Sequence, residues 1–470
     1  MKRNSFLGSL WQYIAKPSAE PSSGTEDMPQ ARRAKVSLNI VVVGCGLGGL
    51  TTAYCLGRGG HKVTVLEQAP AIGEVGAGIQ ISPNISRLFR RWGIGDDIEK
   101  MGIRPGAFSF LRYNTGEQVG WSPLGDQMVE DHGSPYYHIH RADILLLLLS
   151  LAKQHSTIRL DTRVTSIDPS TPSLTLHTGE ILKADLIIGA DGVKSMIREI
   201  VLGKPDKAIP TGDAAYRAII PAEYMAKDPE LKPFVDNPEM TAWMGPNRHI
   251  MMYKIRPTDV NLVLCHPDSG ATESYTAAGD VDKMRDEFKD FEPRVQKILS
   301  LVPRALDWRL MDRPPVPQWI HPESKVALMG DACHPMLPYR AQGAAMAIED
   351  AAVLGILFSY ISDRAQIPAF LAAYQDIRIE RASQTHLSSR LNQRIFHYED
   401  GPEQEARDKS MREAMLHLRG GGGVGLGHEG NANQWADKAK NIAQFSYDAE
   451  SEAEKWWVEN GRRVLGTLPA

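Results

Sequence analysis

One stretch decides the fold: Leu38-Asn39-Ile40-Val41-Val42-Val43-Gly44-Cys45-Gly46-Leu47-Gly48-Gly49-Leu50. Its first six residues are apolar apart from one Asn and rich in β-branched side chains, which is typical of a strand buried on both faces of a parallel sheet. Gly44, Gly46 and Gly49 then fit the pattern G-x-G-x-x-G, and residues 51–56, which contain no Pro, predict a helix. The stretch therefore predicts a strand, a tight turn and a helix.

An acidic residue follows at the position that a dinucleotide site requires. Lys62 to Leu66 predict a second strand, and Glu67 comes directly after it. An acid there accepts hydrogen bonds from ribose hydroxyls, while the glycines let a pyrophosphate approach the amides of the helix N-terminus. A glycine-rich turn without a ligand is the alternative, and the ordered strand, helix, strand and acid disfavour it. The sequence predicts a dinucleotide site and leaves NAD and FAD both open.

The composition is that of a globular protein with about two or three structural units. The chain has 470 residues, is 42% hydrophobic and carries a formal net charge of −4, so it offers no overall attraction to nucleic acid. Its four cysteines lack zinc-site spacing and are expected to be reduced packing residues. We see no signal-peptide core, and the longest apolar run, Ile144–Leu149, is too short to cross a bilayer. These features predict a cytoplasmic protein without a nucleic-acid partner or a membrane span.

Five segments are expected along the chain. Residues 1–36 are rich in Pro, Ser and charge and predict a disordered leader. Residues 37–205 and 321–395 contain the buried strands that end in tight turns, and they predict the two parts of a dinucleotide-binding domain. Residues 206–320 carry short alternating strands that predict an inserted antiparallel sheet, and residues 396–470 predict a C-terminal helical segment.

Small residues and one cation suggest further ligand contacts. Gly78 and Gln80 belong to a glycine-rich apolar segment, which indicates either backbone against a flat ligand or a tight packing turn. Arg141 precedes an apolar helix, where the helix dipole favours an acid instead. A contact with phosphate explains this arginine, and a surface salt bridge is the alternative.

Three junctions together resemble one enzyme family. They are G-C-G-L-G-G-L at residues 44–50, G-A-D-G-V-K-S-M-I-R at 189–198 and G-D-A-C-H-P-M-L-P-Y-R-A-Q-G at 330–343. The sequence resembles the single-component (group A) FAD-dependent aromatic hydroxylases, and salicylate hydroxylase-like fungal monooxygenases are the nearest match. The resemblance implies an α/β fold: a Rossmann-like FAD-binding domain with an inserted antiparallel β-sheet substrate domain, as in p-hydroxybenzoate hydroxylase, and C-terminal helices.

The resemblance also implies a cofactor and the residues that bind it. FAD is expected to bind non-covalently, with NAD(P)H as a transient co-substrate. Glu67 would bind the adenosine ribose, Asp331 the ribityl hydroxyls, and the amides of the helix starting at Gly343 the flavin's pyrimidine edge. The expected cofactor-binding residues are Gly44, Gly46, Gly49, Glu67, Gly78, Gln80, Arg141, Asp191, Asp331, Gly343 and Ala344.

The implied reaction is hydroxylation of a phenolic or related aromatic metabolite. Reduced flavin would react with O2 to form a C4a-hydroperoxide, which transfers one oxygen to an electron-rich ring. The expected partners are thus a small aromatic substrate, O2 and NAD(P)H, in a monomer or a homodimer. Two alternatives remain open: an epoxidase of an alkene, and a non-catalytic Rossmann-fold binding protein, which Asp331 and the helix start at Gly343 disfavour.

Three catalytic residues are expected: Arg217, Tyr253 and Tyr339. Residues 214–218 and 245–253 resemble the segments in which fungal phenol hydroxylases carry an Arg and a Tyr that bind the substrate phenolate. A structural ion pair for Arg217 and a core position for Tyr253 are the alternatives. Tyr339 stands where bacterial salicylate hydroxylases commonly have His, and a Tyr with an ordinary pKa of about 10 is a poor base. Salicylate is therefore not the expected substrate.

Overall fold

The computed structural model describes residues 32–73, 77–270, 277–420 and 431–466. Most of the predicted leader lies outside these ranges. Its last residues bind the folded part of the chain: the Ala34 amide donates to the Gly59 carbonyl at 2.9 Å, and the Arg32 guanidinium lies 3.7 Å from the centre of the Tyr360 ring. Residues 32–36, which were predicted as leader, are thus packed against the fold.

A five-stranded parallel sheet forms the first layer. The central strand β1 (Asn39–Val43) pairs with β2 (Lys62–Leu66) on one side and with β11 (Leu186–Gly189) on the other. The edges are β7 (Ser156–Arg159) and β18 (Val326–Leu328), so the order is β18-β11-β1-β2-β7. All of β11, all of β18 and four of the five residues of β1 are buried, as expected of strands covered on both faces.

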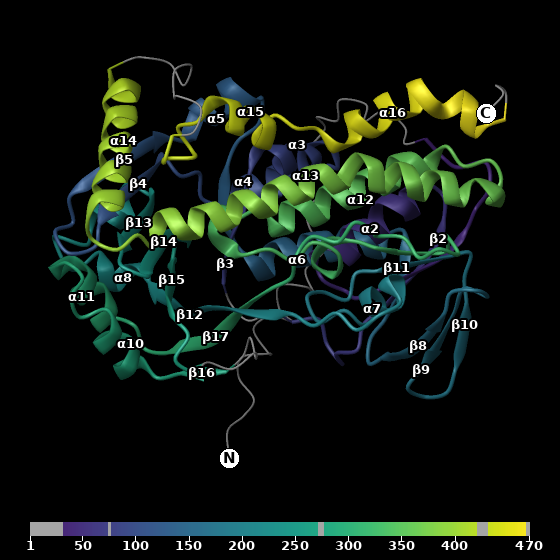
Figure 1. Cartoon of the computed structure of the whole chain (residues 1–470), viewed down its shortest axis with the longest axis horizontal. Helices are drawn as coiled ribbons and strands as arrows, with labels where there is room; N and C mark the ends of the chain where they lie inside the picture. Colours follow the sequence, from purple (N-terminus) through teal and green to yellow (C-terminus); the bar gives the residue numbers. More distant parts are fainter. Residues whose placement is uncertain (1–31, 74–76, 271–276, 421–430, 467–470) are drawn as a thin grey trace. The chain divides into compact units, whose positions relative to one another are not determined.

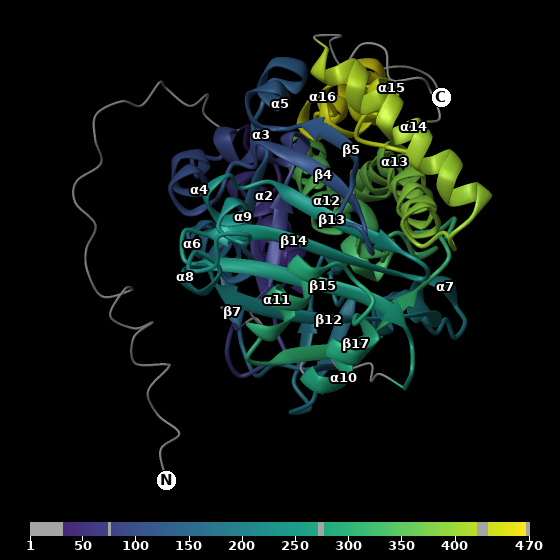
Figure 2. The same cartoon turned by 90° about the vertical axis from the view of Figure 1, so that its left-hand side faces the viewer.

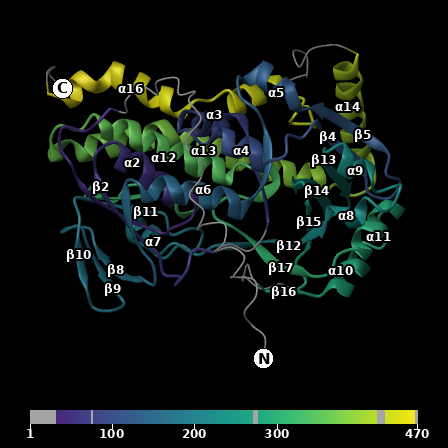
Figure 3. The ribbon, with the colours of Figure 1, turned by 180° about the vertical axis from the view of Figure 1, so that it is seen from behind.

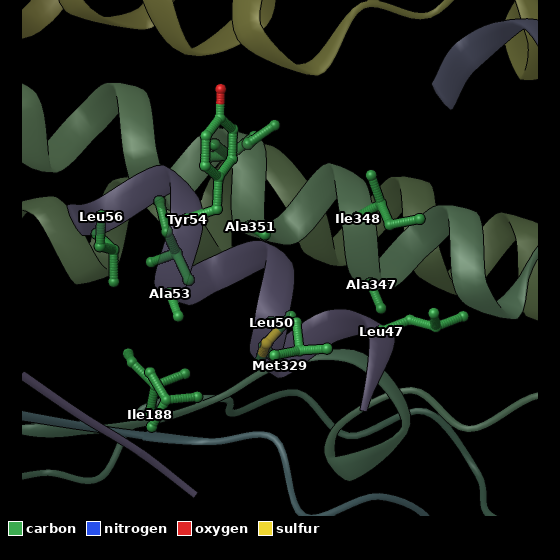
Figure 4. Packing of buried hydrophobic residues seen from close by; sticks show 14 of the residues in the cluster. Leu47, Leu50, Ala53, Tyr54, Leu56, Ile188, Met329, Ala347, Ile348 and Ala351 are labelled. Atoms are coloured by element: carbon green, nitrogen blue, oxygen red, sulfur yellow. The ribbon is translucent and has the colours of Figure 1, made fainter. Parts of the chain in front are cut away.

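Two helices cross closely on one face of this sheet. Leu47 and Leu50 of α2 (Leu47–Arg58) pack beside Ala347 of α12 (Gly343–Ser359), as Figure 4 shows. A Cβ atom at Gly48 would lie 3.2 Å from the Ala347 Cβ, and one at Gly355 would lie 2.6 Å from the Cys55 Cβ. Small residues therefore set the distance between the two helices.

An eight-stranded mixed sheet forms the second layer (Figure 2). Its order is β16 (Ala278–Gly279), β17 (Ala305–Asp312), β12 (Ile209–Pro221), β15 (Asp259–Pro267), β14 (Arg248–Arg256), β13 (Met240–Gly245), β4 (Ala107–Arg112) and β5 (Gln118–Pro123). The sheet extends beyond the predicted range 206–320, because β4 pairs in parallel with β13. This pairing joins distant parts of the chain and leaves no local pattern in the sequence.

Side chains alternate between the two faces of this sheet, and each face packs into a different hydrophobic core. Ile250 and Met252 of β14 pack into the core under one face of the sheet, while Met251 and Tyr253 pack on the opposite face. The second face is the one that turns toward the parallel sheet and its helices, because Met251 and Tyr253 line the same cavity as Gly46 and Gly330, which follow β1 and β18. Side chains at odd positions of β14 are thus available for a site between the layers.

The C-terminal part is helical. The long helix α13 (Ile367–Phe396) runs beside α12 (Figure 1), and α14 (Pro402–Arg419) packs on β5. The residues after them form two helices, α15 (Lys438–Phe445) and α16 (Ala449–Val464), because Asp437 and Asp448 cap two separate starts. Among the described helices, none has both the length and the apolar character that a membrane span requires.

The remaining elements complete the two layers, and the small sheet β8-β9-β10 is best seen from behind (Figure 3). The strands are β3 (Gly78–Ile81), β6 (Tyr137–His140), β8 (Val164–Asp168), β9 (Ser173–Leu176) and β10 (Ile181–Lys183). The helices are α3 (Pro83–Arg91), α4 (Gly95–Met101), α5 (Gly125–His132), α6 (Arg141–Lys153), α7 (Met196–Leu202), α8 (Ala222–Met225), α9 (Pro233–Asp236), α10 (Val281–Glu287), α11 (Pro293–Ser300) and the short turns η1 (Gly330–Ala332), η2 (Pro338–Arg340) and η3 (Arg364–Gln366). The predicted fold class is confirmed.

Candidate active site

A cavity of about 370 Å³ lies between the two layers, within the usual range for a small-molecule site. One end is lined by the starts of α2 and α12 and by the turn after β18, and the other by strands of the large sheet. We call these the cofactor end and the sheet end. The cofactor end is lined by Gly46, Leu47, Gly48, Arg141, Gly330, Asp331, Gly343 and Ala344, and the sheet end by Arg217, Met240, His249, Met251, Tyr253, Val263, Cys265, Tyr339, Phe396 and Trp435.

The three glycines of the first motif serve two different purposes. Gly44 has a φ of +109°, and a Cβ on it would lie 2.3 Å from the Ala190 carbonyl oxygen. A Cβ on Gly49 would lie 2.0 Å from the Gly44 oxygen, so both residues are needed for the turn itself. A Cβ on Gly46 would meet nothing within 4 Å, and this residue lines the cavity. Gly46 therefore leaves open space for a ligand against the backbone.

Two helix N-termini are directed at the cofactor end. Gly46 is the N-cap of α2 and Gln342 the N-cap of α12, and within the described residues neither start is capped by a side-chain hydrogen bond. The free amides and the helix dipoles make both positions suitable for negative charge. Gly343 and Ala344, the first residues of α12, line the cavity, and their contact with a flavin's pyrimidine edge stays a prediction.

Asp331 supplies an acceptor between these helices. Its side chain is exposed to the cavity, and the protein atoms around it displace water and raise its pKa, against the opposing charges of His334 and Arg141. Its Oδ1 lies 3.8 Å from the place of a Cβ on Gly343, so the acid and the helix start are neighbours. The amides of the helix starts can bind phosphate and polar ring atoms, and the Asp331 carboxylate can accept hydrogen bonds from hydroxyl groups. The residues present therefore fit FAD.

Gly78, Gln80 and Arg141 also line the cavity. A Cβ on Gly78 would lie 2.6 Å from the Tyr253 ring, so this glycine is required by packing. Gln80 accepts a hydrogen bond from the Tyr136 hydroxyl at 2.5 Å. Arg141 is the first residue of α6 and faces the cofactor end, where its charge is close enough to lower the pKa of Asp331.

Glu67 and Asp191 are not among the residues that line the cavity. The Glu67 carboxylate accepts hydrogen bonds from the Cys45 and Ala69 amides at 2.9 and 2.8 Å, which fixes it against the glycine turn. The Asp191 carboxylate accepts from the Ser195 hydroxyl at 2.5 Å and from the Ile197 amide at 3.2 Å, next to the start of α7. Both acids support turns of the cofactor end, and their contact with FAD stays a prediction.

Arg217 and Tyr253 meet at the sheet end. The Arg217 guanidinium lies 4.1 Å from the centre of the Trp308 ring, and Arg217 lines the cavity. Burial raises the pKa of Tyr253 to about 12, although the charge of Arg217 and a hydrogen bond with Gln80 oppose this shift. Tyr253 is thus protonated at neutral pH and can donate its O–H to an anion.

Tyr339 lies at the same end but in a different state. Its hydroxyl donates to Asp213 Oδ2 at 2.5 Å, and the same oxygen accepts from Gln393 Nε2 at 2.6 Å. Burial, Cys265 and Asp213 raise the pKa of Tyr339 well above 10. Tyr339 therefore forms part of the cavity wall, and its hydroxyl group is already bonded to Asp213.

Two buried histidines near the cavity were not predicted from the sequence. Nδ1 of His249, on β14, lies 2.8 Å from Nε2 of His397, which follows α13. Burial lowers the pKa of His249 well below its usual value and that of His397 to about 4. Since Tyr253 was expected at the site, strand alternation could have indicated Met251 and His249 on the same face. His397 gave no such signal, because its approach depends on the packing of α13.

Residues of the C-terminal part also line the sheet end, and the sequence did not predict them. Phe396 and Trp435 line the cavity, and the Trp435 ring packs edge-on against Phe108, with ring centres 4.8 Å apart. The Arg340 guanidinium lies 4.5 Å from the centre of the Trp435 ring on another side. These contacts join residues far apart in the chain, so no local motif predicts them.

Known proteins resemble this chain over most of its length. A family model described as "FAD binding domain" matches residues 37–294 and 316–388. The FAD-dependent monooxygenase OpS4 of Beauveria bassiana is 36% identical over 430 residues, which cover 89% of this chain and 96% of that protein. The 6-hydroxynicotinate 3-monooxygenase of Bordetella bronchiseptica is 35% identical, over 75% of this chain and 91% of its own length.

A bacterial relative and a solved structure extend the comparison. The 3-hydroxybenzoate 6-hydroxylase 1 of Aquipseudomonas alcaligenes is 33% identical, over 79% of this chain and 93% of its own length. A salicylate hydroxylase substrate complex aligns with a TM-score of 0.71 at 23% identity, covering 90% of this chain and 98% of that one. At this identity, the structural match shows a shared fold.

Proposed function

We propose that this chain, which belongs to the family of FAD-dependent aromatic monooxygenases, uses NAD(P)H and O2 to hydroxylate a phenolic or related aromatic compound. One observation carries the proposal: a single cavity joins an end suited to FAD with an end that presents Arg217 and Tyr253. A ring bound at the sheet end would lie beside the flavin.

The chain's own residues would hold the cofactor at one end. The amides at Gly46, Gly343 and Ala344 would face its polar and negatively charged groups, and Asp331 would accept hydrogen bonds from its hydroxyls. When bound, FAD supplies electron transfer from NAD(P)H and the activation of O2. The protein supplies orientation, by holding the flavin and the ring in one cavity.

At the sheet end, the residues favour a substrate with an ionisable hydroxyl group. Arg217 would pair with the ring's oxygen anion, and Tyr253, protonated because its pKa is about 12, would donate a second hydrogen bond. A negative oxygen raises the electron density of the ring, which an electrophilic oxygen transfer requires. An isolated alkene offers no anion to these two groups, so the arrangement favours ring hydroxylation over epoxidation.

The relatives suggest which phenols to try first. Two of them act, by their names, on 3-hydroxybenzoate and on 6-hydroxynicotinate, both single rings with a hydroxyl and a carboxylate. We propose a substrate of this class, in which the hydroxyl meets Arg217 and Tyr253. We also propose a cytoplasmic location and a monomer or a homodimer. We propose the five-segment division with two changes: residues 32–36 pack on the FAD-binding domain, and β4 and β5 belong to the large sheet.

The test begins with the purified protein. We expect it to be yellow and to release FAD on denaturation. NADH and NADPH oxidation is then measured against hydroxybenzoates, hydroxypyridines and 4-nitrophenol, with product identified by mass spectrometry. A protein that binds FAD but forms no oxygenated product from any hydroxylated ring would overturn the proposal.

A further inference from the structure

Gln80, on β3, binds a different side chain at each end of its amide group. Its Oε1 accepts a hydrogen bond from the Tyr136 hydroxyl at 2.5 Å, and its Nε2 donates to the sulfur of Met240 at 3.1 Å. A thioether sulfur can accept a hydrogen bond but cannot donate one, so Met240 must face the amide nitrogen. The amide oxygen is then left for Tyr136, and the orientation of the amide group is fixed.

The second N–H of the Gln80 amide is available to Tyr253. Burial raises the pKa of Tyr253 to about 12, and the charge of Arg217 and a hydrogen bond with Gln80 oppose this rise, as expected when the amide donates and the phenol oxygen accepts. The ring of His138 packs 4.6 Å from that of Tyr253, but its Nε2 has no hydrogen-bond partner in the described part of the chain. The Tyr253 O–H is thus left for an acceptor in the cavity, which Gln80 and Tyr253 both line.

We propose that Gln80 and Tyr136 are positioning residues for the substrate: they orient Tyr253 so that its O–H donates to the oxygen of the bound ring. The inference rests on the proposed function, because it requires a ring with an oxygen substituent in the cavity. Gln80 lines the cavity, whereas Tyr136 does not and acts through two hydrogen bonds. No proton is transferred, so Tyr253 stays protonated.

The surroundings of Tyr136 keep its hydroxyl protonated and directed at Gln80. Tyr136 is buried, and the rings of His138 and Phe445 pack edge-on against it, with ring centres 5.9 and 6.1 Å away. Burial raises the pKa of the Tyr136 hydroxyl, against the charge of Arg340. A hydroxyl without an acceptor would cost free energy in such an enclosed place, so the hydrogen bond with Gln80 is maintained.

These hydrogen bonds form a chain that selects the functional group of the ligand. Tyr136 donates to Gln80, Gln80 donates to Tyr253, and each donor polarises the next. An oxygen anion or a hydroxyl oxygen can accept the last hydrogen bond, from the Tyr253 O–H. The nitrogen of an aromatic amine is a poor acceptor, because its lone pair is delocalised into the ring. The arrangement therefore favours a phenol over the corresponding aniline.

The experiment measures ligand binding to the FAD-loaded protein without turnover. 4-Nitrophenol, studied above its own pKa, supplies an oxygen anion, and 4-nitroaniline has the same shape but an amino group that donates. Tyr136→Phe should keep FAD bound and weaken 4-nitrophenolate binding about fivefold, the usual net value of one hydrogen bond. Its affinity for 4-nitroaniline should stay unchanged. Absorbance titrations give both dissociation constants.

Gln80→Met is the second variant. Methionine has about the same length as glutamine but no N–H, so it can neither accept from Tyr136 as an amide does nor donate to Tyr253. We expect the same pattern as in Tyr136→Phe, with weaker 4-nitrophenolate binding and unchanged 4-nitroaniline binding. The FAD content of each variant is measured first.

Two further variants show whether the effect passes through Tyr253. Tyr137→Phe removes the hydroxyl of the next residue along the chain, which donates to Glu99 and does not line the cavity, and it should leave both affinities unchanged. In a Tyr253→Phe background, Tyr136→Phe should change the 4-nitrophenolate affinity no further, because the hydroxyl on which it acts is gone. A purely structural role for Tyr136 would weaken binding equally in both backgrounds.

The outcomes are distinct. Unchanged 4-nitrophenolate affinity in both Tyr136→Phe and Gln80→Met would overturn the inference, and so would an equal loss for 4-nitroaniline or an additive loss in the Tyr253→Phe background. If the variants behave as expected but the wild type oxygenates no hydroxylated ring, the proposed function fails while the positioning role stands. If the wild type forms product and the variants bind 4-nitrophenolate as the wild type does, only the positioning role fails.

Discussion

At the scale of single residues, Glu67 and Asp331 are the two carboxylates expected to bind hydroxyl groups of FAD. Replacing either by Ala should weaken FAD binding by about 1.5–3 kcal/mol, the usual value of a hydrogen bond to a charged group. Asp331→Asn should lose less, because the amide oxygen still accepts. Equilibrium titration with FAD measures all three, and unchanged affinity in both Ala variants would show that the two acids are misassigned.

Arg217 is expected to act on the substrate alone. Arg217→Ala should keep FAD bound but lower product formation by about a hundredfold, because the phenolate loses its counter-charge and its orientation. NAD(P)H consumption should then yield hydrogen peroxide. Once a substrate is identified, the ratio of product formed to NAD(P)H consumed shows whether Arg217 acts on the substrate.

Arg309→Ala is the control for Arg217→Ala. Arg309 lies on the neighbouring strand β17, where it contacts Asp268 at 2.5 Å and does not line the cavity. Its loss should leave the ratio of product to NAD(P)H unchanged. An Arg217→Ala ratio equal to that of Arg309→Ala would remove Arg217 from the mechanism.

At the scale of elements, the turn between β1 and α2 allows a comparison of two glycines. Gly49→Ala should destabilise the fold by about 1–3 kcal/mol or more, because its Cβ would lie 2.0 Å from the backbone oxygen of Gly44. Gly46→Ala should leave stability almost unchanged, since its φ is −77° and its Cβ meets open space.

The FAD affinity should fall in Gly46→Ala, the variant whose stability is unchanged. In Gly46→Ala the new methyl group would occupy space against the α2 amides and weaken FAD binding. Chemical denaturation gives the stability of each variant without FAD, and a FAD titration gives the affinity. A folded Gly46→Ala variant with wild-type affinity would mean that the cofactor does not approach this helix start.

The same elements show what the sequence could predict. The strand, the glycine turn, the second strand and the helix start at Gly343 are local patterns, and all were found. The assignment of 206–320 to the sheet left out β4 and β5, because their pairing with β13 is decided by the tertiary fold. Arg217, Tyr253 and Tyr339 were placed by resemblance to segments of known enzymes, and the structure brings all three to one cavity. His397, Phe396 and Trp435 depend on how α13 and the C-terminal part pack.

At the scale of the whole molecule, FAD should act as part of the structure. Its expected site takes residues from both parts of the parallel-sheet layer, so binding should stabilise the folded state over the unfolded one. A free FAD concentration one hundred times the Kd should add about 2.7 kcal/mol to the free energy of unfolding. Thermal unfolding with and without added FAD measures this, and Asp331→Ala should show a smaller rise in Tm. Equal Tm values for apo and FAD-loaded wild type would contradict a specific site.

The strand order β18-β11-β1-β2-β7 has a consequence for how the protein is made. The first strand of the motif leaves the ribosome early, yet β18 and the start of α12 are synthesised almost 300 residues later, and Trp435 later still. Because chains grow from the N-terminus, a nascent chain cannot complete this cavity until nearly all of it has been translated. Cofactor loading would then be one of the last steps of biosynthesis, and truncated chains would emerge without flavin.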